Sequence, residues 1–412
     1  DGPDYLVWIS GLRLTNGRNK NPDGFGGAIG TQHSLVLDSV IVDNSMARSA
    51  GGLGFSVQYP GQTLLISNSQ FLNNTATELV APTASVNSSG GAFYVAERCP
   101  RTPDLPYTQP VSVTILESDF IGNVVQPVTL GARGGALRSY SLADIFIFDT
   151  VLVGNRVDAP NPPFPGRTYH GGAFDGTAKS LRIESSEISG NSANDVTGAD
   201  VTRSGAIHLV KDALDKQAPG DAMGVQIINS TISGNSSSAT AGAMVVFANV
   251  ALEIRNSTVA ANTAAPTRTG GITLNLGATS PVSANNTARP TLTLVSSILS
   301  DNSSSGGDLA AGTAVFGTFI VNSTHSLIRT LCPPSNCTFG FSGSGNLLTQ
   351  DPLLGPLTDN GGRSRTHALQ AGSPAINAGS NPFGLPDDQR GSGFPRTVGA
   401  GTDMGAYESA SP

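Results

Sequence analysis

The chain has 412 residues, of which 13% are charged and 50 are glycine, and its formal net charge is −7. Lys and Arg number 23 against 30 Asp and Glu, and no basic run stands out, so nucleic acid is not expected as a partner. No apolar stretch approaches the roughly 18 residues of a membrane-spanning helix, so we expect no transmembrane segment. The first residues lack the pattern of a signal peptide, so either a signal has been removed or the chain is a fragment.

In chain order, the first feature is a repeated segment that ends in Asn, as in "LEIRNSTVAAN". Apolar residues stand ten and eight positions before the Asn, a small hydroxyl residue five before it, and an apolar residue three before it. The first copy is one residue short at its start. The copies end at Asn44, Asn74, Asn123, Asn155, Asn191, Asn235, Asn262 and Asn302.

A second phrase alternates with the first: a small pair followed by apolar residues, as in "GGAF" at Gly90, "GGAL" at Gly134 and "GGAF" at Gly171. The apolar residues of the first phrase share a strand face, and the segments are too short and too rich in Val, Ile and Thr for helices. A strand, a corner, a second strand, a turn, Gly-Gly and a third strand form one coil of a parallel β-solenoid. We therefore predict an all-β parallel β-helix over residues 1–345 and a compact C-terminal module over 346–412.

Stacking of coils places like residues on like residues. Asn at a corner can adopt a left-handed backbone and still offer its amide to the Asn above and below, so the eight terminal asparagines are predicted to form a stack. The hydroxyl residue five before each Asn is predicted to bond to its neighbours. Gly-Gly permits positive φ and close approach where the chain re-enters the wall.

The phrases "SSEISGN" and "NSTISGN", with the Gly-Gly re-entry, resemble the coils of secreted bacterial right-handed parallel β-helix proteins. The segment "DPLLGPLTDNGGRSRTHALQAGSPAINAGS" at 351–380, followed by "DDQRG" and "DMGAYE", resembles the choice-of-anchor Q domain. That module stands at the C-terminal end of such β-helices, before surface-anchoring signals. The resemblance implies a right-handed coil and an extracellular or cell-surface location. No anchoring signal follows Glu408 and no capping segment precedes the coils, so both chain ends are expected to be processed or truncated.

Many parallel β-helices are polysaccharide lyases or hydrolases, so an enzyme is the main alternative. The nearest matches to the hydrolase motifs are "YHGG" around His170, "RIE" from Arg182 and "DDQRG" from Asp387. His170 follows a Pro-rich stretch and is interpreted as a surface loop residue, His208 as outward-facing or packed on a wall, and His367 as structural. No catalytic residue is predicted.

Acidic residues also recur six positions before the terminal Asn, at Asp38, Glu117 and Asp149. A paired-carboxylate mechanism needs two acids about 5–10 Å apart, which equivalent positions on adjacent coils would provide. We interpret the column as a solvated outer face. No metal site or other cofactor is predicted, although calcium at "DGPD", "NPDG" or "LTDNGG" is left open.

The insertions between coils are where function is expected to concentrate. Segments 97–111 and 156–169 are Pro-rich and carry Tyr107, Phe164 and Tyr169, which either hold sugar or pack on the wall.

Cys332 and Cys337 in "CPPSNC" are predicted to form a disulfide, while Cys99 has no obvious partner. Nine Asn-x-Ser/Thr triplets occur, and the two at Asn235 and Asn302 lie in the predicted stack, where a glycan would not fit. The triplets either carry glycan on the flanks of the coils or are simply the corner chemistry of the solenoid. If they carry glycan, the better candidates are Asn73, Asn87, Asn285, Asn322 and Asn336.

Together these features predict a secreted, extracellular or cell-surface structural or adhesive protein, an adhesin and glycoprotein without enzymatic activity. The alternative is a carbohydrate-active enzyme acting on the outer face of the β-helix. The opening "YLVWISGLRLTNG", with Trp8 at its centre, reads as a strand pattern with an uncovered edge. A second copy bound head to tail would cover it and extend into a filament, unless a cap was lost by trimming. The expected partners are therefore the chain itself and surface carbohydrate.

Overall fold

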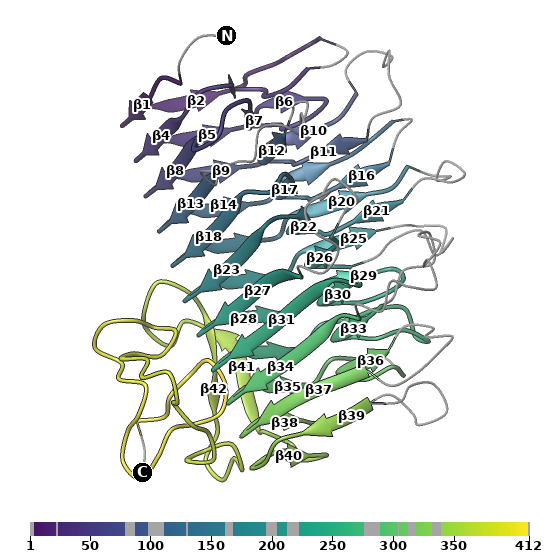
Figure 1. Ribbon diagram of the computed structural model, residues 1–412, viewed down its shortest axis with the longest axis vertical. Helices are drawn as coiled ribbons and strands as arrows, with labels where there is room; N and C mark the ends of the chain where they lie inside the picture. Colours follow the sequence, from purple (N-terminus) through teal and green to yellow (C-terminus); the bar gives the residue numbers. More distant parts are fainter. Residues whose placement is uncertain are drawn as a thin grey trace. The chain divides into compact units, whose positions relative to one another are not determined.

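The chain folds as an all-β right-handed parallel β-helix, as the repeat predicts (Figure 1). Strands of successive coils pair in parallel, and every regular element among the described residues is a strand. This computed structural model describes residues 4–21, 24–78, 87–97, 111–128, 131–160, 168–194, 204–211, 222–275, 289–303, 305–311, 319–331 and 339–410.

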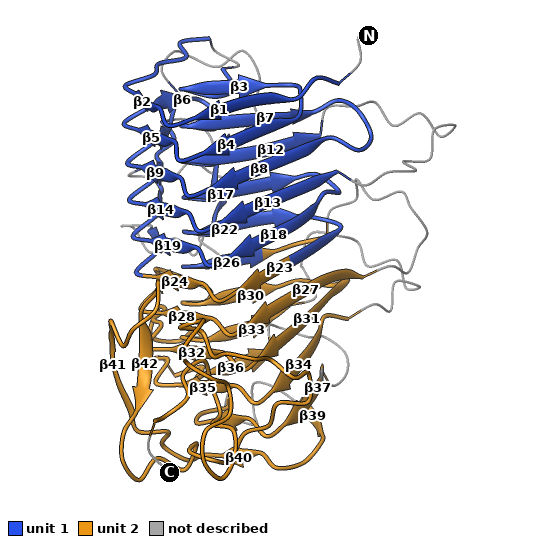
Figure 2. Ribbon diagram, turned by 90° about the vertical axis from the view of Figure 1, so that its left-hand side faces the viewer, with its two compact units in different colours: residues 1–181, 190–208 blue, residues 182–189, 209–412 orange. Residues whose placement is uncertain are grey.

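The chain forms two compact units, which are coloured separately in Figure 2. Unit 1 comprises residues 1–181 and 190–208, and unit 2 comprises residues 182–189 and 209–412. The strands β23 (Ser180–Glu184) and β26 (Ile207–Leu209) contain residues of both units. The boundary predicted after residue 345 separates the β-helix from a C-terminal module and is a different division from that of the two units. It stays a prediction.

Each coil of unit 1 contributes one strand to each of three walls. Wall A contains β1 (Val7–Ser10), β4 (Leu35–Asp38), β8 (Thr63–Ser67), β13 (Ser112–Leu116) and β18 (Asp144–Phe148). Wall B contains β2 (Arg13–Thr15), β5 (Ile41–Asp43), β9 (Gln70–Leu72), β14 (Asp119–Ile121) and β19 (Val151–Val153). Wall C contains β3 (Ile29–Thr31), β7 (Leu53–Val57), β12 (Phe93–Glu97), β17 (Leu137–Tyr140) and β22 (Phe174–Thr177). Shorter strands between walls B and C are β6 (Met46–Ala47), β10 (Thr75–Ala76), β15 (Val124–Val125), β20 (Arg156–Asp158), β25 (Ser192–Asn194), β11 (Ser88–Ser89), β16 (Ala132–Arg133) and β21 (Tyr169–His170).

Unit 2 repeats the same three walls. Wall A contains β27 (Met223–Ile228), β31 (Val250–Arg255), β34 (Thr291–Val295), β37 (Phe319–Thr324) and β39 (Phe339–Ser342). Wall B contains β24 (Glu187–Ser189), β28 (Thr231–Ser233), β32 (Thr258–Ala260), β35 (Ile298–Ser300), β38 (Leu327–Ile328) and β40 (Leu347–Leu348). Wall C contains β30 (Met244–Val246), β33 (Ile272–Leu274) and β36 (Leu309–Ala311), and β29 (Ser236–Ser237) is a short strand between walls B and C.

The core lies inside the coils because residues two apart share a strand face. In β13, Val113 and Ile115 are fully buried, whereas Thr114 between them is partly exposed. Burial of one such side chain contributes about 2 kcal/mol. A single coil cannot enclose these residues alone, so stacking of neighbouring coils supplies the burial.

A ladder of buried asparagines runs from coil to coil in unit 1. The backbone N and Nδ2 of Asn74 both donate to Asn123 Oδ1 at 3.0 Å. Asn123 donates in the same way to Asn155 at 3.0 and 2.9 Å, and Asn155 to Asn191 at 2.9 Å. A second column consists of hydroxyl residues, each bonded to the next coil. For example, the backbone N of Ser69 donates to Oγ of Ser118 at 3.1 Å.

Unit 2 contains an equivalent ladder with a different end. Asn235 donates to Asn262 Oδ1 at 3.0 and 2.8 Å, and Asn262 donates to Asn302 Oδ1 at the same distances. Asn302 then donates to a carboxylate oxygen, Asp308 Oδ1, at 3.0 and 2.7 Å. An acid therefore receives the last bonds of the amide ladder in this unit.

Asn44 lies outside the ladder, so its predicted place in the stack is wrong. The register of β5 with β9 puts Asn44 beside Asn73 and Ser45 beside Asn74. Ser45 is buried and its backbone N donates to Asn74 Oδ1 at 3.1 Å, whereas Asn44 is exposed. The alignment on a terminal Asn is one residue out of register in this copy, which is why the copy looks one residue short.

The left-handed backbone also lies one residue away from its predicted position. It belongs to the residue before each ladder Asn, including the exposed Asn73 (φ 54°) and the partly exposed Gly122 (φ 66°) and Gly154 (φ 64°). The ladder asparagines are not among the described residues with positive φ. The turn and the ladder thus use different residues: the left-handed turn is made most often by Gly, with Asn73, Ala261 and Asp301 in the other coils, and the next Asn places its amide inside the coil.

In unit 2 the chain leaves the coil after β40. The strands β41 (Leu354–Thr358) and β42 (Thr366–Leu369) form an antiparallel pair, and turns follow. This C-terminal segment packs on wall B, where Ala406 N donates to Thr258 Oγ1 at 3.0 Å. The apolar residues at this contact are Ile298, Leu327, Ala375 and Met404.

Candidate functional site

The residues that flank the Gly-Gly phrase lie together on the outer side of wall C in unit 1. In β17 and β22, Leu137 and Phe174 belong to the core, so the next residues, Arg138 and Asp175, lie on the opposite strand face. Arg138 and Asp175 are direct partners in the strand register. Phe174 N donates to the backbone O of Ala206 in the next coil at 3.0 Å. This register places His208 of β26 beside Asp175.

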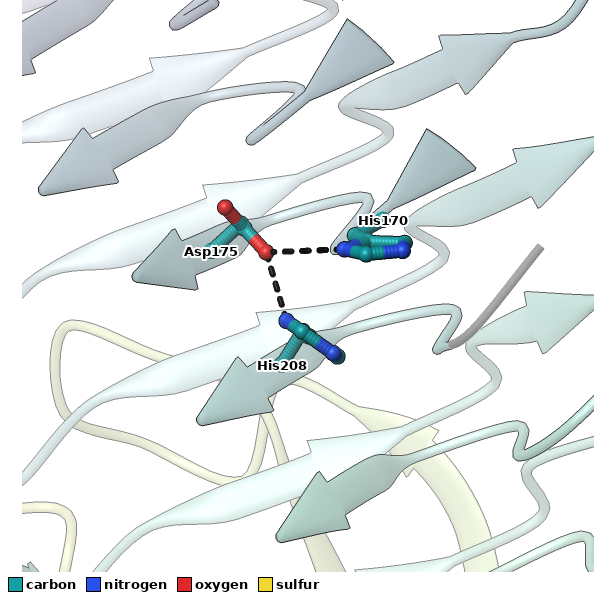
Figure 3. Close-up of side chains that lie close together, drawn as sticks. All are labelled: His170, Asp175 and His208. Carbon is teal, nitrogen blue, oxygen red and sulfur yellow. Dashed lines mark hydrogen bonds and ion pairs between the residues drawn. The ribbon is translucent and has the colours of Figure 1, made fainter. Parts of the chain in front are cut away.

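The close-up in Figure 3 shows three of these side chains converging from β21, β22 and β26. Asp175 Oδ1 lies 2.6 Å from His208 Nδ1 and 3.5 Å from His170 Nδ1 (Figure 3). The two imidazole rings have centroids 4.1 Å apart and are tilted by 39°. The other oxygen of the carboxylate, Asp175 Oδ2, forms an ion pair with Arg138. We call these four residues the His–Asp–Arg cluster.

Burial sets the electrostatics of this cluster. The exposed fractions are 6% for Arg138 and His170, 2% for His208 and 0% for Asp175. A buried carboxylate is stable only when it is paired, and here Arg138 supplies the opposite charge on one oxygen. Among the contacts described, Asp175 Oδ1 faces only the two imidazole nitrogens. Proton transfer or metal binding by this carboxylate would therefore use Oδ1.

Two kinds of chemistry use this set of groups. A carboxylate that orients an imidazole is the basis of many acid–base sites, but the substrate must then reach the second ring nitrogen. With His208 only 2% exposed, a substrate does not reach it in this conformation. Two imidazoles and a carboxylate oxygen also form a donor set for a metal ion, and the three residues place one donor each within 4.8 Å of one another.

The interpretation of His170 as a surface loop residue is wrong. His170 belongs to β21 and is buried, because the Gly-Gly phrase that follows it turns the chain directly into wall C. An added Cβ at Gly172 would lie only 2.1 Å from a backbone oxygen of the neighbouring coil, so this approach requires glycine. The preceding Tyr169 is also fully buried, which favours packing on the wall over sugar binding.

Neither Arg138 nor Asp175 was among the residues predicted from the sequence. A signal was present, because both residues directly follow the Gly-Gly-Ala-apolar phrase, and His208 holds the same place after "SGAI". That column gives the three residues the same position in their repeats, whereas only the strand register shows that they are neighbours in space.

The predicted column of three acids is wrong as well. The strand register places Asp38 beside Ser67, on the wall rather than at the corner. Glu117 and Asp149 are corner residues, with φ 48° and 46°. Glu117 is exposed, as a solvated outer face requires, and Asp149 is partly exposed.

The remaining motif residues lie in unit 2 and are engaged in contacts within that unit. Arg182 pairs with Glu184 at 2.6 Å on the same strand. His367 Nδ1 lies 2.7 Å from Gly355 O and its Nε2 lies 2.8 Å from a serine hydroxyl, while burial lowers its pKa. Asp387 accepts a bond from Asn229 Nδ2 at its backbone O, at 2.8 Å.

Several sequon residues are exposed or partly exposed. Asn73 is exposed at a turn, and Asn87 is partly exposed. Asn322 is exposed but lies in β37 rather than in a loop, and it accepts from Ser342 Oγ at 2.6 Å. Asn285, Asn336, Cys99, Cys332, Cys337, Tyr107 and Phe164 lie outside the described residues.

Comparisons with protein families, with curated proteins and with solved structures found no match to this chain. The secreted status and the choice-of-anchor Q resemblance therefore stay predictions. In the described part of the chain, no helix has the length and hydropathy needed to cross a bilayer.

Proposed function

We propose that the chain is an extracellular or cell-surface β-helix protein with a structural and adhesive role. The observation that carries the proposal is a row of apolar side chains on the outer face of wall A in unit 1. The strand register aligns Trp8, Val36, Leu65 and Phe146, with Thr114 between the last two. Trp8 is 68% exposed and the others are partly exposed. We call this set the outer apolar row.

Contiguous apolar side chains on an outer face are uncommon in soluble proteins and mark interaction surfaces. Wall A of unit 2 offers a contrast, because its equivalent row consists of the polar residues Gln226, Glu253, Thr293, Asn322 and Ser342. The apolar character is thus a property of unit 1 and not a requirement of the coil. A flat row of this kind suits the C–H faces of sugar rings in a surface polysaccharide.

The enzyme alternative receives less support. The His–Asp–Arg cluster on the outer side of wall C is buried, and the acidic column predicted from the sequence is out of register at Asp38. Incubation with acidic and neutral polysaccharides tests this alternative directly. Release of reducing ends or unsaturated products, lost on substitution of Asp149 or Glu117, would establish an enzyme and refute the adhesive role.

The adhesive role is tested by co-sedimentation with insoluble polysaccharides such as cellulose and chitin. We expect retention of the wild type and at least about tenfold weaker binding of a Leu65→Thr, Phe146→Thr variant. Thr114→Ser, in the same row, is the matched control and is expected to bind like the wild type. Absence of retention on every surface, or equal binding by the row variant, contradicts the proposal.

Head-to-tail assembly and glycosylation are part of the same proposal. Tyr5, Leu6 and Leu12 in the first coil are 60%, 62% and 52% exposed, an apolar edge that a preceding segment or a second copy would cover. Electron microscopy of native material separates filaments from single particles. Intact mass before and after deglycosylation tests the sequons, and we expect glycan at Asn73 or Asn322 rather than at the buried Asn235.

A further inference from the structure

We infer that His170, Asp175 and His208 bind one transition-metal ion on the outer side of wall C in unit 1. This inference is independent of the adhesive role. It rests on three side chains of ligating type, from three separate strands, that converge in a buried position (Figure 3).

The donor distances suit a single small ion. Donors at about 2.0–2.2 Å from a tetrahedral ion lie about 3.3–3.6 Å from one another. The His170 Nδ1 to Asp175 Oδ1 distance of 3.5 Å already fits this separation. The His208 Nδ1 to Asp175 Oδ1 distance of 2.6 Å is that of a hydrogen bond, and replacing its proton by an ion requires these atoms to move apart by less than about 1 Å.

Arg138 adds the orienting contact that metal-binding carboxylates usually have. Its ion pair with Asp175 Oδ2 holds the carboxylate so that Oδ1 alone faces the two histidines. Asp175 therefore binds through one oxygen, which leaves at least one coordination position for water or a small ligand. Because Arg138 occupies the second carboxylate oxygen, we expect a single ion and no second one beside it.

The donor set indicates which ion fits. Two imidazole nitrogens and one carboxylate oxygen suit Zn²⁺, Ni²⁺, Cu²⁺ or Co²⁺. Ca²⁺ and Mg²⁺ prefer shells of oxygen atoms and are not expected here.

The fold explains how residues far apart in sequence form this site. The Gly-Gly phrase carries the chain from β21 into β22, which brings His170 and Asp175 onto the same outer side of the coil. One coil further on, His208 occupies the register position of Asp175. The site thus combines Asp175 and His208, which follow the Gly-Gly phrase or its equivalent in two successive coils, with His170, which directly precedes the Gly-Gly phrase.

The experiment measures metal bound to untagged full-length protein. The protein is stripped with a chelator, equilibrated with Zn²⁺, Ni²⁺, Cu²⁺ or Co²⁺ and freed of excess ion, and the bound metal is counted by mass spectrometry. We expect about one ion per wild-type chain. His170→Gln and Asp175→Asn are expected to weaken binding at least about tenfold. His33→Gln is the matched control, because this histidine is partly exposed and pairs with Asp4 at 3.7 Å, outside the cluster.

A second measurement on the wild type alone covers the case in which the variants fail to fold. Pulsed electron paramagnetic resonance of the Cu²⁺-loaded protein is expected to show coupling to two histidine nitrogens. Absence of that coupling, or wild-type binding no stronger than that of a folded His170→Gln, His208→Gln double variant, overturns the inference and leaves the cluster as an internal ion pair. Wild-type behaviour in His33→Gln together with loss in the cluster variants supports it.

Discussion

Replacement of Asn123 by alanine tests whether the asparagine ladder stabilises the coil. The side chain makes four hydrogen bonds: Oδ1 accepts two from Asn74 at 3.0 Å, and Nδ2 donates to Phe71 O at 2.8 Å and to Asn155 Oδ1 at 2.9 Å. At about 1 kcal/mol net for each bond, the loss is about 4 kcal/mol. Asn74 N, at a fully buried residue, then loses its acceptor. Against a typical total of about 5–15 kcal/mol, this loss is severe.

The measurement is urea unfolding monitored by circular dichroism, together with hydrogen exchange of amides in β9, β14 and β19. Stacked coils open locally, so exchange should rise first around Asn123 rather than uniformly. Asn123→Ser is expected to have an intermediate effect, since Ser45 holds the ladder position in an earlier coil and its Oγ accepts from Gly17 N at 3.1 Å.

Asn73→Gly is the matched control. Asn73 is exposed with φ 54°, and glycine stands at this place in the next two coils, so the change should stay within about 0.5 kcal/mol. If Asn123→Ala were as stable as Asn73→Gly, the ladder would contribute nothing measurable and the argument from hydrogen-bond count would be refuted.

Three further outcomes follow from buried groups and close approaches in the coils. Burial raises the pKa of Asp308 from 3.8 to about 6. The protonated carboxyl therefore stabilises the fold below about pH 4, by at most about 3 kcal/mol. This contribution is lost as the pH rises through about 6. The stability of the wild type relative to Asp308→Asn should therefore fall between pH 4 and pH 7, and a constant difference in urea titrations would contradict this. Glu408→Gln should cost about 3–5 kcal/mol, because it leaves the fully buried Arg396 without the carboxylate that it contacts at 2.8 Å; a melting temperature equal to that of the wild type would contradict it. Gly172→Ala should prevent or severely weaken folding, since the new Cβ would lie 2.1 and 2.5 Å from backbone atoms of other segments, whereas Gly154→Asn, at an open turn with φ 64°, should be tolerated; expression and thermal melting compare the two.

Much of the fold could be predicted because the coil is encoded locally. The alternation in segments such as "LEI" and "VTI" fixes which side chains face inward, and the repeat of Asn and Ser at constant offsets predicts stacking. These signals lie within about ten residues of one another, so they are unaffected by the insertions between coils. The hydrogen bonds from Asn74 to Asn191 and from Asn235 to Asn302 have the arrangement that stacking implies.

The candidate site could not be predicted in the same way, because it depends on register between coils. Spacings between repeats vary with the insertions, so the sequence does not say that Asp175 and His208 are neighbours, nor that Ser45 rather than Asn44 continues the ladder. Only backbone hydrogen bonding between coils sets these pairings, and a shift by one residue moves a side chain to the other face.

Short-range periodicity in the sequence thus specifies the parallel coil, its inward residues and the columns of Asn and Ser. The tertiary structure decided which residues stack across coils, which residue of each turn is left-handed, and where burial collects charge. These are properties of contacts between segments about 30 or more residues apart, such as Asp175 with His208, where packing and strand register override any local pattern.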